Sequence, residues 1–193
     1  MIKKILPIAV LVILILWGIS VNNGLVEKEE AVNNSWSKVE SQYQRRADLI
    51  PNLVATVKGA ADFEQETLTA VTDARSRATG ITLTPETLND EQAMANFQKA
   101  QSNLSGALSR LLVSVEKYPD LKANANFRDL SAQLEGTENR IAVERGRFND
   151  SAKEFNTSVR KFPASLIASI SGFKTKAYFK ADEGSAKAPT VSF

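Results

Sequence analysis

The chain has 193 residues, with 24 Lys and Arg, 22 Asp and Glu, no His and no Cys. Without Cys there is no disulfide, thiolate metal site or Cys nucleophile, and without His the commonest general base and metal ligand are missing. Lys3 and Lys4 are the only charged residues before Glu27, so the remaining chain has 22 basic and 22 acidic residues. This balance argues against nucleic acid as a partner.

The sequence also lacks a phosphate-binding loop and a nucleophile elbow. Carboxylate-based metal sites in helical bundles normally include His as well. We therefore expect no cofactor, no metal site and no enzymatic activity.

The N-terminal segment is the most apolar part of the chain. Residues 5–21 carry no charge, and a membrane-crossing helix needs about 20 apolar residues. We interpret residues 5–24 as a transmembrane anchor and residues 1–4 as a cytoplasmic N-terminus, because Lys3 and Lys4 precede the span and an acidic segment follows it. The rest of the chain then lies outside the cytoplasm.

The alternative is a cleavable signal peptide, with a small-x-small site at Gly18 and Ser20. The apolar stretch is longer than most signal-peptide cores, and the chain after it resumes as a helical pattern. Both features favour an uncleaved anchor.

Beyond the anchor, apolar residues recur at alternating steps of three and four, as in helices that pack along their length on other helices. The pattern predicts three long helices, at residues 36–79, 94–118 and 127–162. Pro51 lies inside the first run and predicts either a kink near Asp48 or the start of a second helix. Residues 80–89 are predicted to form a loop.

The predicted fold class is therefore all-α: an N-terminal transmembrane helix followed by an elongated antiparallel bundle of three long helices plus a short C-terminal helix. The bundle domain covers residues 25–183, and residues 184–193 form a loosely held tail. Glu144, Ser151 and Ser158 interrupt the apolar stripe of the third helix. That part of the stripe is either solvated or binds a partner or another protomer.

The short apolar segment 164–170 is expected to fold back on the bundle as a fourth helix. Phe173, Tyr178 and Phe179 follow it. These aromatic side chains either cap the bundle or contact the lipid interface, where nearby lysines would also be favourable.

Long motifs across the chain resemble the LemA family. They include Trp-Ser-x-Val from Trp36, Arg-Arg-x-Asp-Leu-Ile-Pro-Asn-Leu-Val from Arg45, Tyr-Pro-Asp-Leu-Lys-Ala from Tyr118, and Leu-Glu-Gly-Thr-Glu-Asn-Arg-Ile-Ala from Leu134. The resemblance implies a bacterial protein with one N-terminal membrane anchor and an antiparallel, LemA-like four-helix bundle. It implies no reaction. Asp62-Phe63-Glu64 stands where the family commonly has His-Glu, so a family histidine is missing.

Two polar groups stand out within the apolar helices. One consists of Arg45, Arg46, Asp48 and Asn52, and the other of Glu135, Glu138 and Arg140 together with Asn139. The first either binds a carboxylate or phosphate or forms ion pairs that set the helix register. We hypothesise that the arginines pair with Glu135 and Glu138 and so clamp the first and third helices together.

These features predict a membrane-anchored scaffold or interaction protein in the inner membrane of the bacterial envelope. Its partners would be membrane lipid around the anchor and either a partner protein or further copies in a homo-oligomer, but no nucleic acid. The alternative is a ligand- or peptide-sensing protein that signals through the Pro51 kink.

The C-terminal residues 191–193, Val-Ser-Phe, have two interpretations. They either pack on an apolar groove of the bundle or form a recognition tag for a PDZ-type domain.

Overall fold

The computed structural model describes the backbone of residues 2–59 and 64–181 and the side chains of residues 6–59 and 64–181. This part of the chain is helical and contains no strand, which confirms the all-α prediction. Its elements are α1 (Ile2–Lys58), α2 (Gln65–Thr79), the 3-10 helix η1 (Thr87–Asn89), α3 (Glu91–Val115), α4 (Pro119–Ala123), α5 (Ala125–Arg160) and α6 (Ala164–Ser171).

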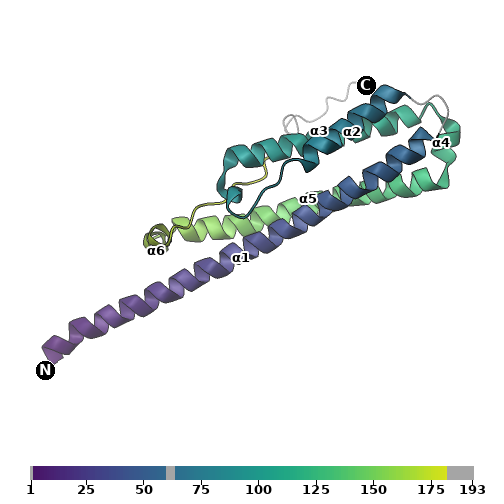
Figure 1. Cartoon of the computed structure of the whole chain (residues 1–193). Helices are drawn as coiled ribbons and strands as arrows, with labels where there is room; N and C mark the ends of the chain where they lie inside the picture. The colour runs from purple at the N-terminus through teal and green to yellow at the C-terminus, as the bar shows by residue number, and fades with distance from the viewer. Residues whose placement is uncertain (1, 60–63, 182–193) are drawn as a thin grey trace, which may run out of the picture.

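The four longest helices form an elongated antiparallel bundle. Figure 1 shows α5 running back along α1, while α2 and α3 form a second antiparallel pair beside them. At 1.5 Å per residue, the 57-residue α1 is about 85 Å long and the 36-residue α5 about 54 Å. The N-terminal part of α1 therefore projects from one end of the bundle.

The predicted start of a second helix at Pro51 is wrong. Pro51 lies within α1, which continues to Lys58, and the next helix begins only at Gln65. The run predicted as one helix over residues 36–79 is thus two helices that fold back on each other. The bundle consequently has four long helices where the sequence pattern predicts three.

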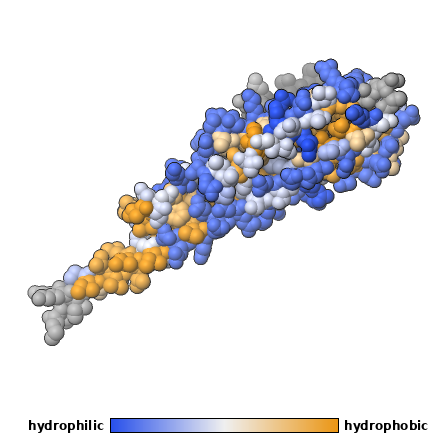
Figure 2. All heavy atoms as spheres, in the orientation of Figure 1, coloured by the Kyte–Doolittle hydropathy of each residue, from blue (hydrophilic) through white to orange (hydrophobic). Residues whose placement is uncertain are grey.

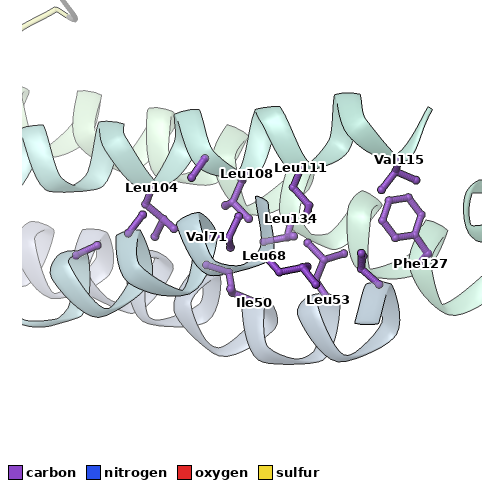
Figure 3. Packing of buried hydrophobic residues seen from close by; sticks show 14 of the residues in the cluster. Ile50, Leu53, Leu68, Val71, Leu104, Leu108, Leu111, Val115, Phe127 and Leu134 are labelled. Atoms are coloured by element: carbon purple, nitrogen blue, oxygen red, sulfur yellow. The ribbon is translucent and has the colours of Figure 1, made fainter. Parts of the chain in front are cut away.

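Two apolar clusters fill the bundle. The distal cluster lies at the α4 end and includes Ile50, Leu53, Leu111 and Leu134 (Figure 3). The proximal cluster lies toward the projecting end of α1 and is rich in aromatic residues, among them Trp36, Phe97, Phe148, Phe155 and Phe179. Edge-to-face contacts join Trp36 to Phe97 and to Phe148, with ring centroids 5.5 and 5.6 Å apart.

The projecting part of α1 is apolar but not buried. Large side chains from Leu6 to Ile19 are exposed, and Figure 2 shows them as a hydrophobic stem below a mostly polar bundle. Of the helices in the described chain, α1 alone is long and apolar enough to cross a membrane. The first fully buried side chain, Leu25, marks the beginning of the bundle.

The short helix predicted at residues 164–170 is confirmed as α6, which packs on α5 and α1. A cis peptide bond between Phe162 and Pro163 precedes it. Gly172 ends it with a φ of 79°, a left-handed conformation that glycine adopts without steric cost. Residues 182–193, including the predicted Val-Ser-Phe end, lie outside the described residues.

Of the three polar residues on the stripe of α5, Ser151 and Ser158 contact α1, whereas Glu144 accepts from Arg147 of α5 itself at 2.6 Å. The Oγ atoms of Ser35 and Ser151 lie 2.9 Å apart, and Lys28 Nζ donates to Ser158 Oγ at 2.5 Å. Contact with α1 therefore accounts for the stripe at Ser151 and Ser158, for which the sequence suggested solvent or another protein.

Candidate functional site

A permanently charged side chain lies in the middle of the bundle. Arg46 is only 1% exposed, and it separates Tyr43 of the proximal cluster from Ile50 of the distal cluster. Its guanidinium lies over the Tyr43 ring, 5.1 Å from the centroid. Burying a charge is costly unless it is paired and hydrogen-bonded, so the contacts of Arg46 decide whether the bundle tolerates it.

Three side chains accept hydrogen bonds from Arg46. Its Nη1 donates to Glu138 Oε1 of α5 at 2.6 Å and to Ser105 Oγ of α3 at 2.7 Å. Its Nη2 donates to Gln101 Oε1 of α3. Gln101 Nε2 in turn donates to the Ala78 carbonyl of α2 at 3.2 Å. These contacts, here called the polar layer (Arg46, Gln101, Ser105 and Glu138), connect all four long helices.

A groove of about 800 Å³ opens beside the polar layer. Its charged lining consists of the cations Arg46, Lys99, Arg145 and Lys180 and one carboxylate, Glu138. Arg145 is held in place at the edge, because it stacks over the Phe179 ring at 4.7 Å and donates to the Lys180 carbonyl at 3.1 Å. The excess of positive charge in this lining suits a carboxylate or phosphate group.

The segment after α6 lies along the bundle as an extended strap, defined here as residues 173–181. Side-chain amides of the bundle each form a pair of hydrogen bonds with the N–H and carbonyl of one strap residue. Asn156 donates to the Lys176 carbonyl at 2.8 Å and accepts from the Lys176 N–H at 2.7 Å. Asn149 does the same with Phe179, at 3.0 and 2.9 Å, and Gln98 with Lys180, at 2.5 and 3.2 Å.

The strap also carries a buried charge. Lys176 Nζ donates to Glu29 Oε1 of α1 at 2.7 Å and lies 5.6 Å from the centroid of the Phe155 ring. Phe179 stacks on Trp36 at 6.1 Å. The aromatic residues Phe173 and Phe179 thus complete the proximal cluster, whereas Tyr178 is exposed.

Pro51 has a local role that connects α1 to α2. Proline has no N–H, so the Ala47 carbonyl, four residues earlier, loses its usual partner in the helix. Arg75 Nε of α2 donates to that carbonyl at 2.8 Å. Ala47 is buried, where an unpaired carbonyl would be costly. The proline therefore creates an acceptor that α2 occupies, while α1 remains continuous.

Comparison with known proteins places the chain in one family and identifies relatives in bacteria. The model of the LemA family matches residues 35–193. The chain belongs to the LemA family. Relatives of this LemA-family protein include magnetosome protein MamQ of Magnetospirillum gryphiswaldense, 28% identical over 81% of the chain and 64% of the relative. Protein LemA of Metamycoplasma hominis is 25% identical over 83% of the chain and 69% of the relative. MamQ 2 of Paramagnetospirillum magneticum is 26% identical over 82% of the chain and 64% of the relative.

The chain spans slightly less than two thirds of the MamQ proteins that it matches, 64% of their length. Family membership together with the apolar N-terminal helix supports a membrane-associated LemA-family protein.

The residues singled out in the sequence of this LemA-family protein separate into two sets. Arg46 and Glu138 meet in the polar layer. The others lie exposed on the outer faces of α1 and α5, namely Arg45, Asp48, Asn52, Glu135, Asn139 and Arg140. Asp48 accepts from Gln44 at 2.8 Å. The hypothetical clamp thus contains one arginine and one glutamate, and the structure describes no contact of Arg45 with Glu135.

Several residues of these sites escaped the sequence analysis. The sequence assigned no contact to Gln101, Asn149, Asn156 or Arg75. Pro51 carried a usable signal, because a proline within a helix leaves the carbonyl four residues earlier without its donor. Within the described residues, no group of His, Cys, Asp and Glu is arranged to hold a metal ion.

Proposed function

We propose that this LemA-family protein is a membrane-anchored scaffold of the bacterial envelope. In this proposal α1 crosses the inner membrane once, and the bundle presents its long helical faces, outside the cytoplasm, to a partner protein or to further copies. The scaffold acts without a cofactor, without enzymatic activity and without nucleic acid as a partner.

The observation that carries the proposal is the continuity of α1. One helix contains the exposed apolar stem and, from Val32 to Val57, buried residues of both apolar clusters. A continuous helix transmits position and orientation, so an anchored stem fixes where the bundle stands. That coupling suits a protein whose role is to hold a binding surface at a defined place near the membrane.

Topology is tested with single cysteines, because the native chain has none. Val113, which is 69% exposed on α3 far from the stem, is replaced by Cys. A membrane-impermeant maleimide should label V113C in cells once the outer barrier is opened. Labelling only after the inner membrane is lysed would show that the bundle lies in the cytoplasm.

The scaffold role is tested by crosslinking in cells. A photo-reactive residue at exposed Val143 of α5 or at Val113 of α3 reports what lies against each face. We expect defined protein adducts, or adducts between copies, that depend on the position of the probe. A strictly monomeric full-length protein with no adduct from any bundle position would refute the scaffold proposal.

A second candidate, ligand or peptide sensing, is favoured by the cation-rich groove. A ligand present at 100 times its dissociation constant adds about 2.7 kcal/mol to the free energy of unfolding. A thermal-shift screen of the full-length protein with carboxylates, phosphates and cell-wall peptides therefore tests this candidate. A shift that disappears in K99A/R145A would favour sensing, and the absence of any shift would favour the scaffold.

A further inference from the structure

The helix α6 exposes an apolar face although it packs on the bundle. Phe162 just before the helix, Leu166 and Ile170 are 76%, 57% and 83% exposed. Their spacing of four residues places Leu166 and Ile170 on one side of α6. The opposite side, with buried Ala168 and half-buried Ile167, packs against α1 and α5. The exposed side, with Phe162, is called the α6 face below.

The α6 face lies beside the stem of α1. A Cβ added at Gly18 would lie 3.5 Å from Ile167 Cδ1, and Ser171 Oγ donates to Asn22 Oδ1 at 2.8 Å. Both contacts fall near the end of the predicted span, residues 5–24. Gly18 precedes residue 24 by six residues, or about 9 Å along a helix.

In the proposed crossing, Gly18 and Asn22, which α6 adjoins, lie at the depth of the membrane–water interface. Amphipathic helices at the interface bury their apolar face about 5–10 Å into the boundary between headgroups and acyl chains. Trp17, next to Gly18, is of the residue type that concentrates at this level. Polar Asn22 and Asn23 follow at the end of the stem.

The orientation of α6 also fits a membrane surface. Figure 1 looks down the axis of α6 while α1 and α5 run across the picture, so α6 crosses both at a steep angle. If α1 crosses the bilayer, α6 lies close to the membrane plane. Arg160, Lys161 and Lys174 at its two ends are exposed and within reach of lipid phosphates. Figure 2 shows the hydrophobic residues of α6 next to the hydrophobic stem.

We propose that α6 is a membrane foot, whose Phe162, Leu166 and Ile170 insert into the bilayer beside the point where α1 leaves it. The inference rests on the proposed membrane crossing by α1. The α6 face is covered by lipid of the same membrane, because this face is continuous with the stem that the lipid surrounds. The protein then has two attachments to the bilayer, one that crosses it and one that lies in its surface.

The test measures depth in the bilayer at single sites of the full-length protein. I170C and L166C are labelled with an environment-sensitive fluorophore and reconstituted into vesicles of phosphatidylethanolamine and phosphatidylglycerol. Brominated lipids then quench the label, with bromine placed either near the glycerol or near the chain ends. I13C in the stem and V113C at the distal end are the matched controls, because all four native residues are exposed and apolar.

We expect strong quenching at residues 166 and 170 by bromine near the glycerol, strong quenching at residue 13 by bromine near the chain ends, and none at residue 113. Quenching at residue 13 but not at residues 166 and 170 would overturn the foot and leave the anchor intact. The absence of quenching at residue 13 would overturn the membrane crossing, and with it the foot.

A second measurement distinguishes lipid from protein as the occupant. Oxidation of unlabelled I170C in the vesicles should yield no more disulfide-linked dimer than V113C. Efficient dimer formation at residue 170 without lipid quenching would overturn the proposal and assign the α6 face to a contact between copies. Because these side chains are exposed, L166S/I170S should keep the melting temperature in detergent while it reduces quenching at a label on F162C.

Discussion

Arg46 combines nearly complete burial with a charge that it cannot lose. Its partner Glu138 is 39% exposed, so solvent stabilises one member of the pair and the protein alone must stabilise the other. Buried ion pairs contribute little net stability, but removing one member is strongly destabilising. The polar layer therefore serves chiefly to specify the register of the four helices, because only one register places Arg46 beside its three acceptors.

R46M is expected to lower the free energy of unfolding by about 3 kcal/mol, because Glu138 and Gln101 lose their donor in a partly buried setting. R45M, one residue away on the exposed face of α1, is the matched control and should change stability by less than about 0.5 kcal/mol. Chemical unfolding of the full-length protein in detergent measures both. Equal losses in the two variants would contradict the importance of the polar layer.

Arg75 and Pro51 should be energetically coupled through the Ala47 carbonyl. R75M should cost about 1–3 kcal/mol, because a buried carbonyl loses its donor. In the P51A background the cost should be smaller, because the restored N–H of residue 51 can donate to the same carbonyl. A double-mutant cycle measures this coupling. A cost of R75M that is the same in the native and the P51A backgrounds would disprove it.

The strap takes most of its backbone hydrogen bonds from side chains of α3 and α5, and one from the Leu88 carbonyl. Asn149 and Asn156 lie seven residues apart on α5, on the same face, and each makes two hydrogen bonds to the strap backbone. The strap in turn covers Trp36 and Phe155 of the proximal cluster. Its order and the packing of that cluster should therefore change together.

N149A/N156A is expected to release the strap while the helices persist. Amide hydrogen exchange at Lys176 and Phe179 should become faster by orders of magnitude, since local opening then needs no break of these bonds. N139A, an exposed asparagine of α5, is the control and should leave exchange unchanged. Slow exchange at Lys176 in the double variant would show that the other contacts hold the strap without the two asparagines, among them the hydrogen bond from the Ala177 N–H to the Leu88 carbonyl at 2.7 Å and the apolar contacts.

The sequence predicted helix type and extent well where an apolar stripe continued, as in α3 and α5. The prediction failed for residues 36–79. The apolar stripe of α1 continues in step into that of α2, so the pattern does not mark the turn between Lys58 and Gln65, whereas Pro51 looks like a helix break. The pairing of Arg46 with Glu138 was predicted, and the burial of Arg46 was predictable as well. Arg46 continues the alternating steps from Tyr43 to Ile50, so a charged residue occupies a seam position. The strap could not be predicted, because an extended segment that hydrogen-bonds to side-chain amides shows no periodic pattern of apolar residues.

Because α1 runs without a break from the stem into the bundle, it should hold the bundle at a fixed angle to the stem. Spin labels at I13C and V113C in vesicles should give one narrow distance distribution. A flexible Gly-Ser insertion after Asn23 should broaden it, whereas the same insertion in the loop at Thr84 should not. A broad distribution in the uninterrupted chain would show that stem and bundle move independently.

The continuity of α1 also makes the chain a lever. From Leu25 to Lys58 the helix extends about 50 Å beyond the stem. Membrane helices tilt to match the local bilayer thickness, over a range of about 0–40°. A change in tilt of about 20° would move the distal end sideways by about 17 Å. If α1 crosses the bilayer as proposed, a change in membrane thickness too small to alter any contact within the bundle would thus shift the distal end sideways.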